Sequence, residues 1–346
     1  MTGNLKKTSL ILMTLLLTLI FAIGCSCSTE SNQNPSTENP VSEESGTENE
    51  GNEDADASVD PSAEDEEPAE TPSDNEPIVF EDPVFLELLK KELGKEEIYT
   101  SDLEKYTNIK IAADEFIFLA AAGETEISII HFNEDAFEYE DVRYEGFGTL
   151  RSLADLKHFK NLDKLYITLQ PEIDYDTLPE NVLKTVRIFN LYQSQVEDIG
   201  FLEKFENLIS LNLNTNKISD LSPLKDKTAI MYLSLNWNNV EDLSPVASLT
   251  GLKRLSAYGN KIQDLAPLSQ LPSLEQIEFY QNLIKDISPL KNITTLIKIE
   301  LINNQIEDVS PLEEFESFEE LRLSGNPITN IELLDHIENL EYDPVY

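Results

Sequence analysis

Hydrophobic residues recur at fixed positions along the second half of the chain. In the copy that begins at Leu208, apolar residues stand 3, 5, 10, 13 and 16 positions further on, and an Asn stands 8 positions further on. Such copies begin at Val186, Leu208, Ile230, Leu252, Leu274, Leu296 and Phe318, each 22 residues after the last. A copy at Leu162 is two residues longer. A fixed period of this length predicts that each copy is one structural unit stacked on its neighbours.

The alternation inside a copy predicts its local structure. Leu211 and Leu213 flank the polar Asn212, which is typical of a short strand with one buried face. Further on, Asp220 opens a turn, and Ser222 and Pro223 predict a short helical turn with Ser as its cap. We therefore expect an α/β fold: a right-handed leucine-rich repeat solenoid with a curved parallel β-sheet on its concave face and short 3-10 turns on its convex face.

Two polar columns run through the copies. Asn ends the strand in most of them, and we expect its buried amide to bond its own turn and the next coil's backbone. The Asn residues are Asn216, Asn238, Asn260, Asn282, Asn304 and Asn326, with Ser194 at this place in the second copy. Asp occupies positions 220, 242, 264, 286 and 308. This column could in principle hold metal ions, but turn capping already accounts for it.

The region before the repeats, residues 78–161, predicts an N-terminal cap followed by a degenerate repeat. Asp82 precedes Pro83 as a helix cap, and Gly94 ends the helix. A second helix is predicted to start at Ser101, with Glu104 completing a capping box. Residues 107–150 suggest strands or imperfect repeats through Ile127, Ile129, Phe132, Phe137, Tyr139, Val142 and Tyr144. Leu153, Leu156 and Leu162 repeat the spacing of the later copies, which predicts a broken repeat before the first clear one.

The chain starts with a leader of residues 1–24. Lys6 and Lys7 precede an apolar run and small residues, as in a secretory signal peptide. Residues 22–25, Ala-Ile-Gly-Cys, resemble the lipobox of bacterial lipoproteins, although Ala22 stands where Leu is usual. That resemblance implies cleavage before Cys25, acylation of its thiol, and a place on the extracytoplasmic face of the cell membrane. An uncleaved signal anchor is the alternative.

Residues 25–77 predict a disordered acidic tether. Positions 28–77 hold 17 Asp and Glu and no Lys or Arg, with almost nothing apolar to bury. Weak calcium binding by these carboxylates is the alternative to a plain spacer. The part from residue 78 onward carries a net charge of −26, which disfavours nucleic acid and anionic lipid surfaces as partners. It holds no cysteine, so disulfides and cysteine-based zinc sites are excluded there.

The repeats with their C-terminal cap span residues 162–346 and resemble those of the bacterial internalin-type leucine-rich repeat family. The motif NxIxDLSPL stands at residues 216–224 and returns at 304–312 with Val309 for Leu. The opening helices resemble that family's N-terminal cap. The resemblance implies protein recognition through the concave sheet, often in adhesion to a host receptor. Neither an immunoglobulin-like domain nor a cell-wall sorting motif is found after the repeats, which leaves adhesion open beside a role as envelope scaffold or assembly factor.

The variable strand positions predict where a protein partner would bind. Small polar residues in the middle of the sheet are flanked by tyrosines, and aromatics with polar tips are enriched at interfaces. The candidate residues are Tyr192, Tyr232, Trp237, Arg254, Tyr258 and Tyr280. The second to fifth copies carry no acid at their strand positions. The alternative is that exposed strands simply favour Tyr, Asn and Ser.

The sequence offers no catalytic constellation. The histidines His131, His158 and His336 are scattered, and phosphate-loop and serine-elbow motifs are lacking. Glu278 and Glu300 would be neighbours, but Lys298 beside them favours a charge cluster over a pair of catalytic carboxylates. We therefore expect a monomeric binding protein, not an enzyme, without cofactor or metal.

Overall fold

The computed structural model describes residues 76–124, 130–131, 136–139 and 141–344, with side chains except at 130–131. These residues belong to one compact unit, Asp74–Tyr346. The predicted leader, Cys25 and almost all of the predicted tether lie outside the described residues, as do Ile127, Ile129 and Phe132. Within the described part, no helix has both the length and the apolar character that a membrane span requires.

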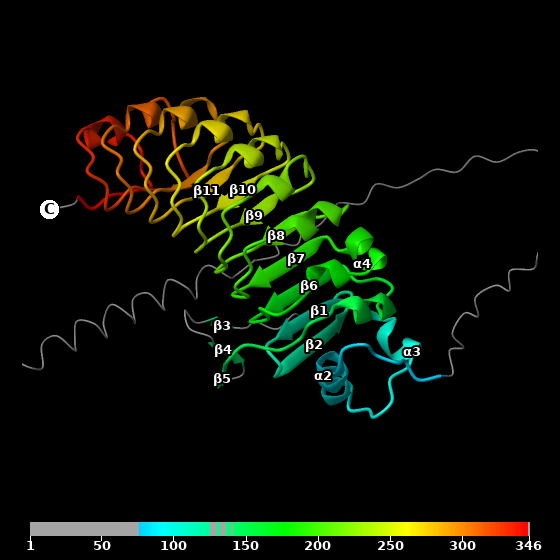
Figure 1. Ribbon diagram of the computed structural model, residues 1–346. Coiled ribbons are helices and arrows are strands. Elements are labelled where there is room, and N and C mark those ends of the chain that lie inside the picture. Colours follow the sequence, from blue (N-terminus) through cyan, green and yellow to red (C-terminus); the bar gives the residue numbers. More distant parts are fainter. Residues whose placement is uncertain (1–75, 125–129, 132–135, 140, 345–346) are drawn as a thin grey trace, which may run out of the picture. The chain divides into compact units, whose positions relative to one another are not determined.

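The repeats form the predicted leucine-rich repeat solenoid, built on an 11-stranded sheet in the order β14 to β6, then β1 and β2. Described neighbours in this sheet are parallel except β1 and β2, which are antiparallel. The strands are β1 (Tyr106–Ala112), β2 (Phe116–Ala121), β6 (Lys164–Thr168), β7 (Ile188–Tyr192), β8 (Ser210–Asn212), β9 (Tyr232–Ser234), β10 (Arg254–Ser256), β11 (Gln276–Glu278), β12 (Lys298–Glu300), β13 (Glu320–Arg322) and β14 (Leu340–Glu341). Figure 1 shows them side by side.

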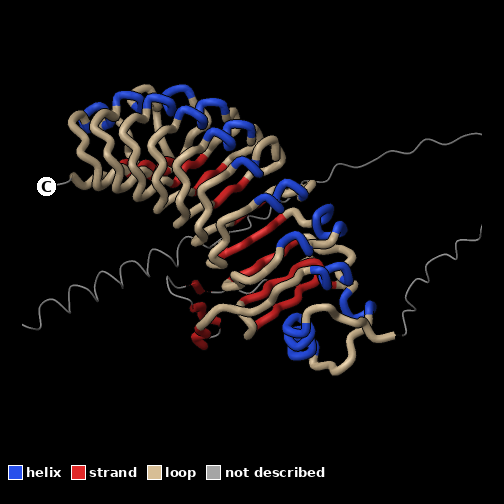
Figure 2. The backbone as a smooth tube through the Cα atoms, viewed as in Figure 1, coloured by secondary structure: helices blue, strands red, loops and turns tan. Residues whose placement is uncertain are grey.

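Short helical turns line the opposite side of the coils, as Figure 2 shows in blue. They are 3-10 helices of three to five residues, and the five turns between residues 222 and 312 carry a Pro directly after their first residue. They are η1 (Ala154–His158), η2 (Tyr175–Thr177), η3 (Gly200–Lys204), η4 (Ser222–Leu224), η5 (Ser244–Ser248), η6 (Ala266–Gln270), η7 (Ser288–Asn292), η8 (Ser310–Leu312) and η9 (Ile331–Leu334). The copy at Leu162, which is two residues longer than the others, also contains a six-residue α-helix, α4 (Glu180–Thr185).

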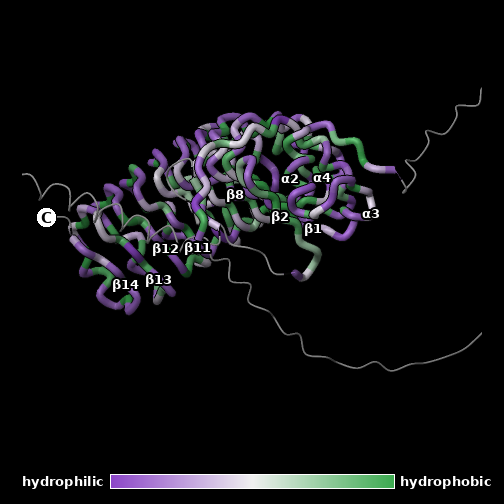
Figure 3. The backbone as a smooth tube through the Cα atoms, turned by 90° about the horizontal axis from the view of Figure 1, so that it is seen from below, coloured by the Kyte–Doolittle hydropathy of each residue, from purple (hydrophilic) through white to green (hydrophobic). Residues whose placement is uncertain are grey.

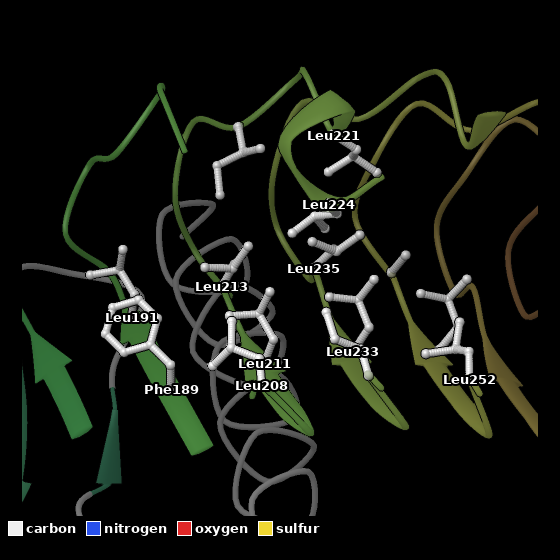
Figure 4. Packing of buried hydrophobic residues seen from close by; sticks show 14 of the residues in the cluster. Phe189, Leu191, Leu208, Leu211, Leu213, Leu221, Leu224, Leu233, Leu235 and Leu252 are labelled. Carbon is white, nitrogen blue, oxygen red and sulfur yellow. The ribbon is translucent and has the colours of Figure 1, made fainter. Parts of the chain in front are cut away.

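Between the strands and the turns lies a continuous aliphatic core. Leu211, Leu213, Leu233 and Leu235 are each at most 2% exposed and point inward in rows that repeat from coil to coil, as seen in Figure 4. Figure 3 shows the matching alternation of hydrophobic and hydrophilic segments along the tube. Full burial of one such side chain is worth roughly 1.5–3 kcal/mol, so stability comes from the stacking of copies.

The Asn column forms a ladder of hydrogen bonds between coils. Nδ2 of Asn238 donates to the carbonyls of Leu235 (3.0 Å) and Leu213 (2.9 Å), and its Oδ1 accepts the N–H of Ile218 (3.0 Å). Leu213 and Ile218 belong to the preceding coil. The prediction that the amide bonds its own turn is confirmed, but the prediction that it bonds the next coil was wrong, because the side chain is directed toward the earlier copy.

The first two copies use other side chains at the ladder position. Ser194 accepts the N–H of Gln170 at 3.2 Å and donates to the carbonyl of Tyr192 at 3.0 Å. Gln170, fully buried, donates to the carbonyl of Ala113 at 2.5 Å and accepts the N–H of Leu150 at 3.2 Å. The longer Gln side chain reaches residues that are 57 and 20 positions earlier in the chain. The ladder therefore continues into the region before the first clear copy.

The Asp column caps the turns. Asp286 Oδ1 accepts the N–H of Ser288 at 2.8 Å, and Asp242 does the same for Ser244 at 2.7 Å. The Ser that was predicted as the cap is the first residue inside the 3-10 turn. The N-cap position is an aliphatic residue, Leu243 or Ile287, and the Asp just before it accepts the N–H of the Ser. Within the described residues, no group of three or more His, Cys, Asp or Glu side chains is arranged to hold a metal ion.

The N-terminal cap begins with α2 (Pro83–Leu93), as predicted. Oδ1 of Asp82 accepts the N–H groups of Val84 and Phe85, and Gly94 ends the helix at a φ of +64°. Phe85, Leu88 and Leu89 join the repeat core. In the second helix, α3 (Thr100–Leu103), Tyr99 stands at the cap and Asp102 accepts its N–H at 3.0 Å, so the predicted start at Ser101 with Glu104 was wrong by two positions.

Two buried carboxylates fasten this cap to the first coil. Asp155, fully buried, accepts the N–H groups of Glu81 (2.9 and 3.0 Å) and Asp82 (2.8 Å). Asp82 in turn accepts the N–H groups of Arg151 (3.0 Å) and Ser152 (3.2 Å) through its second oxygen. Hydrogen bonds of backbone N–H groups to a carboxylate are stronger than neutral ones, so this arrangement stabilises the entry into the solenoid.

The broken repeat predicted around Leu153 is split by a long insertion. Its strand is β1, which pairs in parallel with β6 through Asn108 and Lys164, and its turn is η1, about forty residues later. The intervening residues form β2 and a three-stranded antiparallel sheet of β3 (Ile130–His131), β4 (Ala136–Tyr139) and β5 (Val142–Glu145). Phe137, Tyr139, Val142 and Tyr144 therefore lie in strands, as the sequence suggested, but not in imperfect repeats.

Candidate partner-binding face

The outward strand positions form three columns, which we call the sheet face. Cα pairing places Ile188, Ser210, Tyr232 and Arg254 in register, as the 22-residue period predicts. The first column is Lys164, Ile188, Ser210, Tyr232, Arg254, Gln276, Lys298 and Glu320. The second is Tyr166, Asn190, Asn212, Ser234, Ser256, Glu278, Glu300 and Arg322. The third, just past most strands, is Thr168, Tyr192, Asn214, Asn236, Tyr258, Tyr280, Ile302 and Ser324.

The structure brings five of the six predicted binding residues to an accessible surface. Tyr232 is 42% exposed and Arg254 is exposed beside it, while Trp237, Tyr258 and Tyr280 are half-buried. The five come from adjacent coils, so they share one stretch of the sheet face.

Tyr192 is the exception, because it is only 4% exposed. It ends the five-residue strand β7, in register with the buried Thr168. The insertion also reaches this part of the sheet, since the N–H of Gly148 donates to the carbonyl of Leu169 at 2.7 Å and Leu169 donates to Tyr192 at 3.3 Å. Tyr192 therefore supports the sheet here and offers a partner little surface.

The indole of Trp237, the only tryptophan in the chain, lies against the next coil. Trp237 has a φ of +56°, in the left-handed region, and so does Gly259, one period later, at +68°. A Cβ at Gly259 would lie 2.4 Å from Cε3 and 2.7 Å from Cδ2 of the indole. Glycine at this position is thus required for the ring to lie on the backbone, which gives the sheet face a fixed aromatic platform.

Gly259→Ala is expected to displace the indole. The added methyl group cannot occupy a point 2.4 Å from a ring carbon, so Trp237 must move outward and its fluorescence emission should shift to the red. Crowding and backbone strain should lower the free energy of unfolding by about 1–3 kcal/mol. Gly123→Ala is the matched control, because Gly123 has a φ of +82° with nothing within 4 Å of the added Cβ. Unchanged emission in Gly259→Ala would contradict the placement of the ring.

The floor beside the aromatic residues is a network of hydrogen-bonded amides and hydroxyls. Asn214 Oδ1 accepts the hydroxyl of Ser234 and the N–H of Asn236, both at 2.7 Å. One coil further, Asn236 Oδ1 accepts the hydroxyl of Ser256 at 2.9 Å and the N–H of Tyr258 at 3.0 Å. The network fixes these side chains before any partner arrives, which reduces the entropy lost on binding.

A charge cluster occupies the C-terminal part of the sheet face. The ammonium of Lys298 lies 2.8 Å from Glu300, 2.9 Å from Glu320 and 3.5 Å from Glu278. Arg322 pairs with Glu320 at 2.5 Å. Burial lowers the pKa of Lys298, but its hydrogen bonds to Glu300 and Glu320 and the charge of Glu278 together raise it well above its usual range. The ammonium of Lys298 lies near both Glu278 and Glu300. The two carboxylates therefore belong to the charge cluster that the sequence predicted.

The histidines do not assemble a site among the described side chains. Burial lowers the pKa of His158, whose ring lies 5.6 Å from that of Phe80 in the N-terminal cap. A ring nitrogen of His336 lies 2.9 Å from the carbonyl of Phe315, near the last turn. The side chain of His131 lies outside the described ones.

Two residues of this face, Gly259 and Glu320, were not predicted from the sequence, because their roles depend on contacts with side chains of neighbouring copies. Gly259 was not singled out, although its position one period after the sole tryptophan could have marked it. Glu320 was not linked to Lys298, although it stands 22 residues later and is therefore its direct neighbour in the first column.

Comparison with known proteins supports the repeat fold. The family described as Leucine Rich repeats (2 copies) matches residues 184–226 and 250–292. Among solved structures, an internalin, InlF, from Listeria monocytogenes is 25% identical with a TM-score of 0.51, over 76% of this chain and 84% of that one. Internalin C2 of the same organism is 19% identical with a TM-score of 0.49, over 76% of this chain and 93% of that one.

A leucine-rich repeat protein of Leptospira interrogans is also similar, with 24% identity and a TM-score of 0.49 over 57% of this chain and 52% of that one. No curated protein matches. The chain therefore contains leucine-rich repeats and resembles internalins, which are generally scaffolds for protein–protein interaction.

Proposed function

We propose that the chain is a lipid-anchored surface protein that binds a protein partner through the stretch of the sheet face around Tyr232, Trp237, Arg254, Tyr258 and Tyr280. The observation that carries this proposal is the concentration of accessible aromatic side chains and one arginine on a fixed polar floor. Tyr, Trp and Arg are the residue types that dominate interface energetics, and a pre-ordered surface retains more of the interaction energy.

The partner is a protein outside the cytoplasm, and two roles fit that description. One is adhesion to host or other cells, which the likeness to an internalin favours. The other is an envelope scaffold or assembly factor that binds the producing cell's own proteins. Both use the same face, and the protein acts as a monomer in either.

Capture separates the two roles. The full chain, solubilised in detergent and immobilised, is incubated with labelled surface proteins of host cells and, separately, with envelope proteins of the producing bacterium. Retention from only one of the two sources assigns the role. Captured protein must be lost with the sheet-face variant Tyr232→Ala/Arg254→Ala and kept with the turn-side variant Lys291→Ala; equal retention by both variants would refute a partner site on this face.

The anchor is proposed to be an acyl-modified Cys25. Three residues before it, the sequence Ala-Ile-Gly completes the resemblance to a lipobox, and two or three acyl chains would attach the protein stably to a membrane.

Replacing Cys25 is expected to remove lipid labelling. In bacteria fed an alkyne analogue of palmitate, the wild-type protein should incorporate the label and Cys25→Ser should not. Cys27→Ser is the matched control, and it should be labelled like the wild type. Equal labelling of the Cys25→Ser variant, or none of the wild type, would exclude this site of modification.

A further inference from the structure

The sheet face is charged differently from the rest of the folded part. On β1, the three columns continue through Asn108, Lys110 and Ala112. Across β1 and β6–β10 they comprise 18 positions and contain no Asp or Glu. At the acid content of residues 78–346, roughly three of these positions would be acidic, so this part of the face departs from the composition around it. It carries three cations: Lys110, Lys164 and Arg254.

These cations are held among aromatic and polar side chains. The ammonium of Lys110 lies over the ring of Tyr166, 4.8 Å from its centroid. Lys164 is paired with Asn108, which lies two residues before Lys110 on β1. Arg254 is exposed, and its Nε donates to Gln276 at 2.6 Å. Positive charge is therefore present on the two outer strands of this row of six, β1 and β10, which lie about 24 Å apart at the usual strand spacing.

The polar groups between the cations favour the same kind of ligand. The amide oxygens of Asn214 and Asn236 already accept two hydrogen bonds each, and Oδ1 of Asn212 accepts the N–H of Asn214 at 2.9 Å. The oxygens of Asn214 and Asn236 are therefore engaged inside the network, and the Nδ2 group of Asn212 can donate to a partner. This floor offers donors, and donors bind carbonyl and carboxylate oxygens.

The other end of the sheet face has the opposite sign. Across β11–β14 the acids Glu278, Glu300, Glu320 and Glu341 outnumber the cations Lys298 and Arg322. Asp343 follows β14 with its N–H bonded to Ser324. A carboxylate on a partner is thus attracted by one end of the face and repelled by the other, which gives the partner one orientation.

We propose that the part of the sheet face on β1 and β6–β10 binds a carboxylate-bearing segment of the protein partner. The proposal rests on the partner-binding function proposed above and specifies its chemistry. A peptide segment fits better than a sulfated polysaccharide, because three cations spread over six strands are too sparse for a densely charged polyanion, while tyrosines and amide donors between them suit peptide side chains and carbonyls.

The sole tryptophan gives a local readout. The full chain in a neutral detergent is titrated with a blocked 12-residue peptide of alternating Glu and Ser, and Trp237 emission is followed at about 20 mM salt, where screening is weak. Parallel titrations use the same peptide with Lys for Glu, and a heparin-type sulfated oligosaccharide. We expect the acidic peptide to change the emission even though the folded part is strongly acidic.

Charge reversals locate the contact. Lys164→Glu/Arg254→Glu should weaken binding of the acidic peptide at least tenfold. Lys285→Glu/Lys291→Glu makes the same change in net charge at exposed turn-side positions. With both variants compared at about 0.15 M salt, where the Debye length is about 8 Å, the turn-side variant should keep the peptide affinity within about twofold of the wild type. Equal weakening by the two variants would mean that only total charge matters, and it would overturn the proposal.

The other outcomes separate this inference from the proposed function. A response to the Lys peptide alone, or to the sulfated oligosaccharide alone, overturns the inference and leaves partner binding at this face standing. No response to any probe overturns the inference as well. Failure of the proposed function shows elsewhere, in captured protein that is insensitive to Tyr232→Ala/Arg254→Ala.

Discussion

Asn238→Ala is expected to lower the free energy of unfolding by about 3–5 kcal/mol. The side chain is 7% exposed and makes four hydrogen bonds within and between coils. Alanine leaves the buried N–H of Ile218 without this acceptor, which costs about 1–3 kcal/mol. The carbonyls of Leu213 and Leu235 each lose one of two amide donors and keep the other, from Asn216 and Asn260, so the remaining loss is that of the hydrogen bonds themselves, about 1 kcal/mol each. Urea unfolding followed by circular dichroism measures the loss.

The neighbouring Asn239→Ala is the matched control. Asn239 has the same side chain one position later but is exposed, so its removal should change the free energy of unfolding by at most about 0.5 kcal/mol. A difference of less than about 1 kcal/mol between the two variants would show that the Asn column does not tie the coils together.

Tyr232→Ala/Arg254→Ala is expected to weaken partner affinity at least 100-fold, which corresponds to about 2.7 kcal/mol. The two residues are direct neighbours on β9 and β10, and they hold the exposed centre of the accessible stretch. Removal of a large aromatic ring and of a guanidinium at the centre of an interface removes the contacts that carry most of its energy. Surface plasmon resonance with the captured partner gives the change, which should lie mainly in the dissociation rate.

Both side chains are exposed, so their loss should leave the unfolding transition nearly unchanged. A turn-side substitution, Lys291→Ala, controls for charge and should retain full affinity. If the double variant binds within threefold of the wild type while its fold is intact, the partner does not use this stretch of the sheet face.

The repeat period determines most of what could be predicted about the fold. Because the chain completes one coil every 22 residues, residues 22 positions apart occupy the same column of the sheet face. The observed pairing of Tyr232 with Arg254 agrees with this spacing. The helix cap at Asp82 was equally readable, because the preferences of Asp and Pro at a helix start are local.

What could not be predicted depends on contacts between distant residues. The strand of the broken repeat, β1, is separated from its turn by the insertion, so no fixed spacing reveals it. Asp155 looks like any acid near a turn, and only the fold brings it to the N–H groups of residues 81 and 82.

The candidate site shows the same division. The position of Tyr192 in its column was predictable, but its burial was not, because it depends on how the insertion packs beside Leu169. The direction of the Asn ladder also lay beyond the pattern, since coil-to-coil offset is set by the backbone geometry of the turn. The sequence pattern predicts the position of a residue on its repeat. The exposure of its side chain depends on how the neighbouring coils and the insertion pack against it.

Site-specific photo-crosslinking tests the central claim most directly. A benzophenone amino acid replaces Tyr232 on the sheet face in one variant and Lys291 on the turn side in another, and each is irradiated in the presence of the captured partner. The account predicts a covalent adduct with the partner from position 232 and none from position 291. An adduct from position 291 without one from position 232 would contradict it.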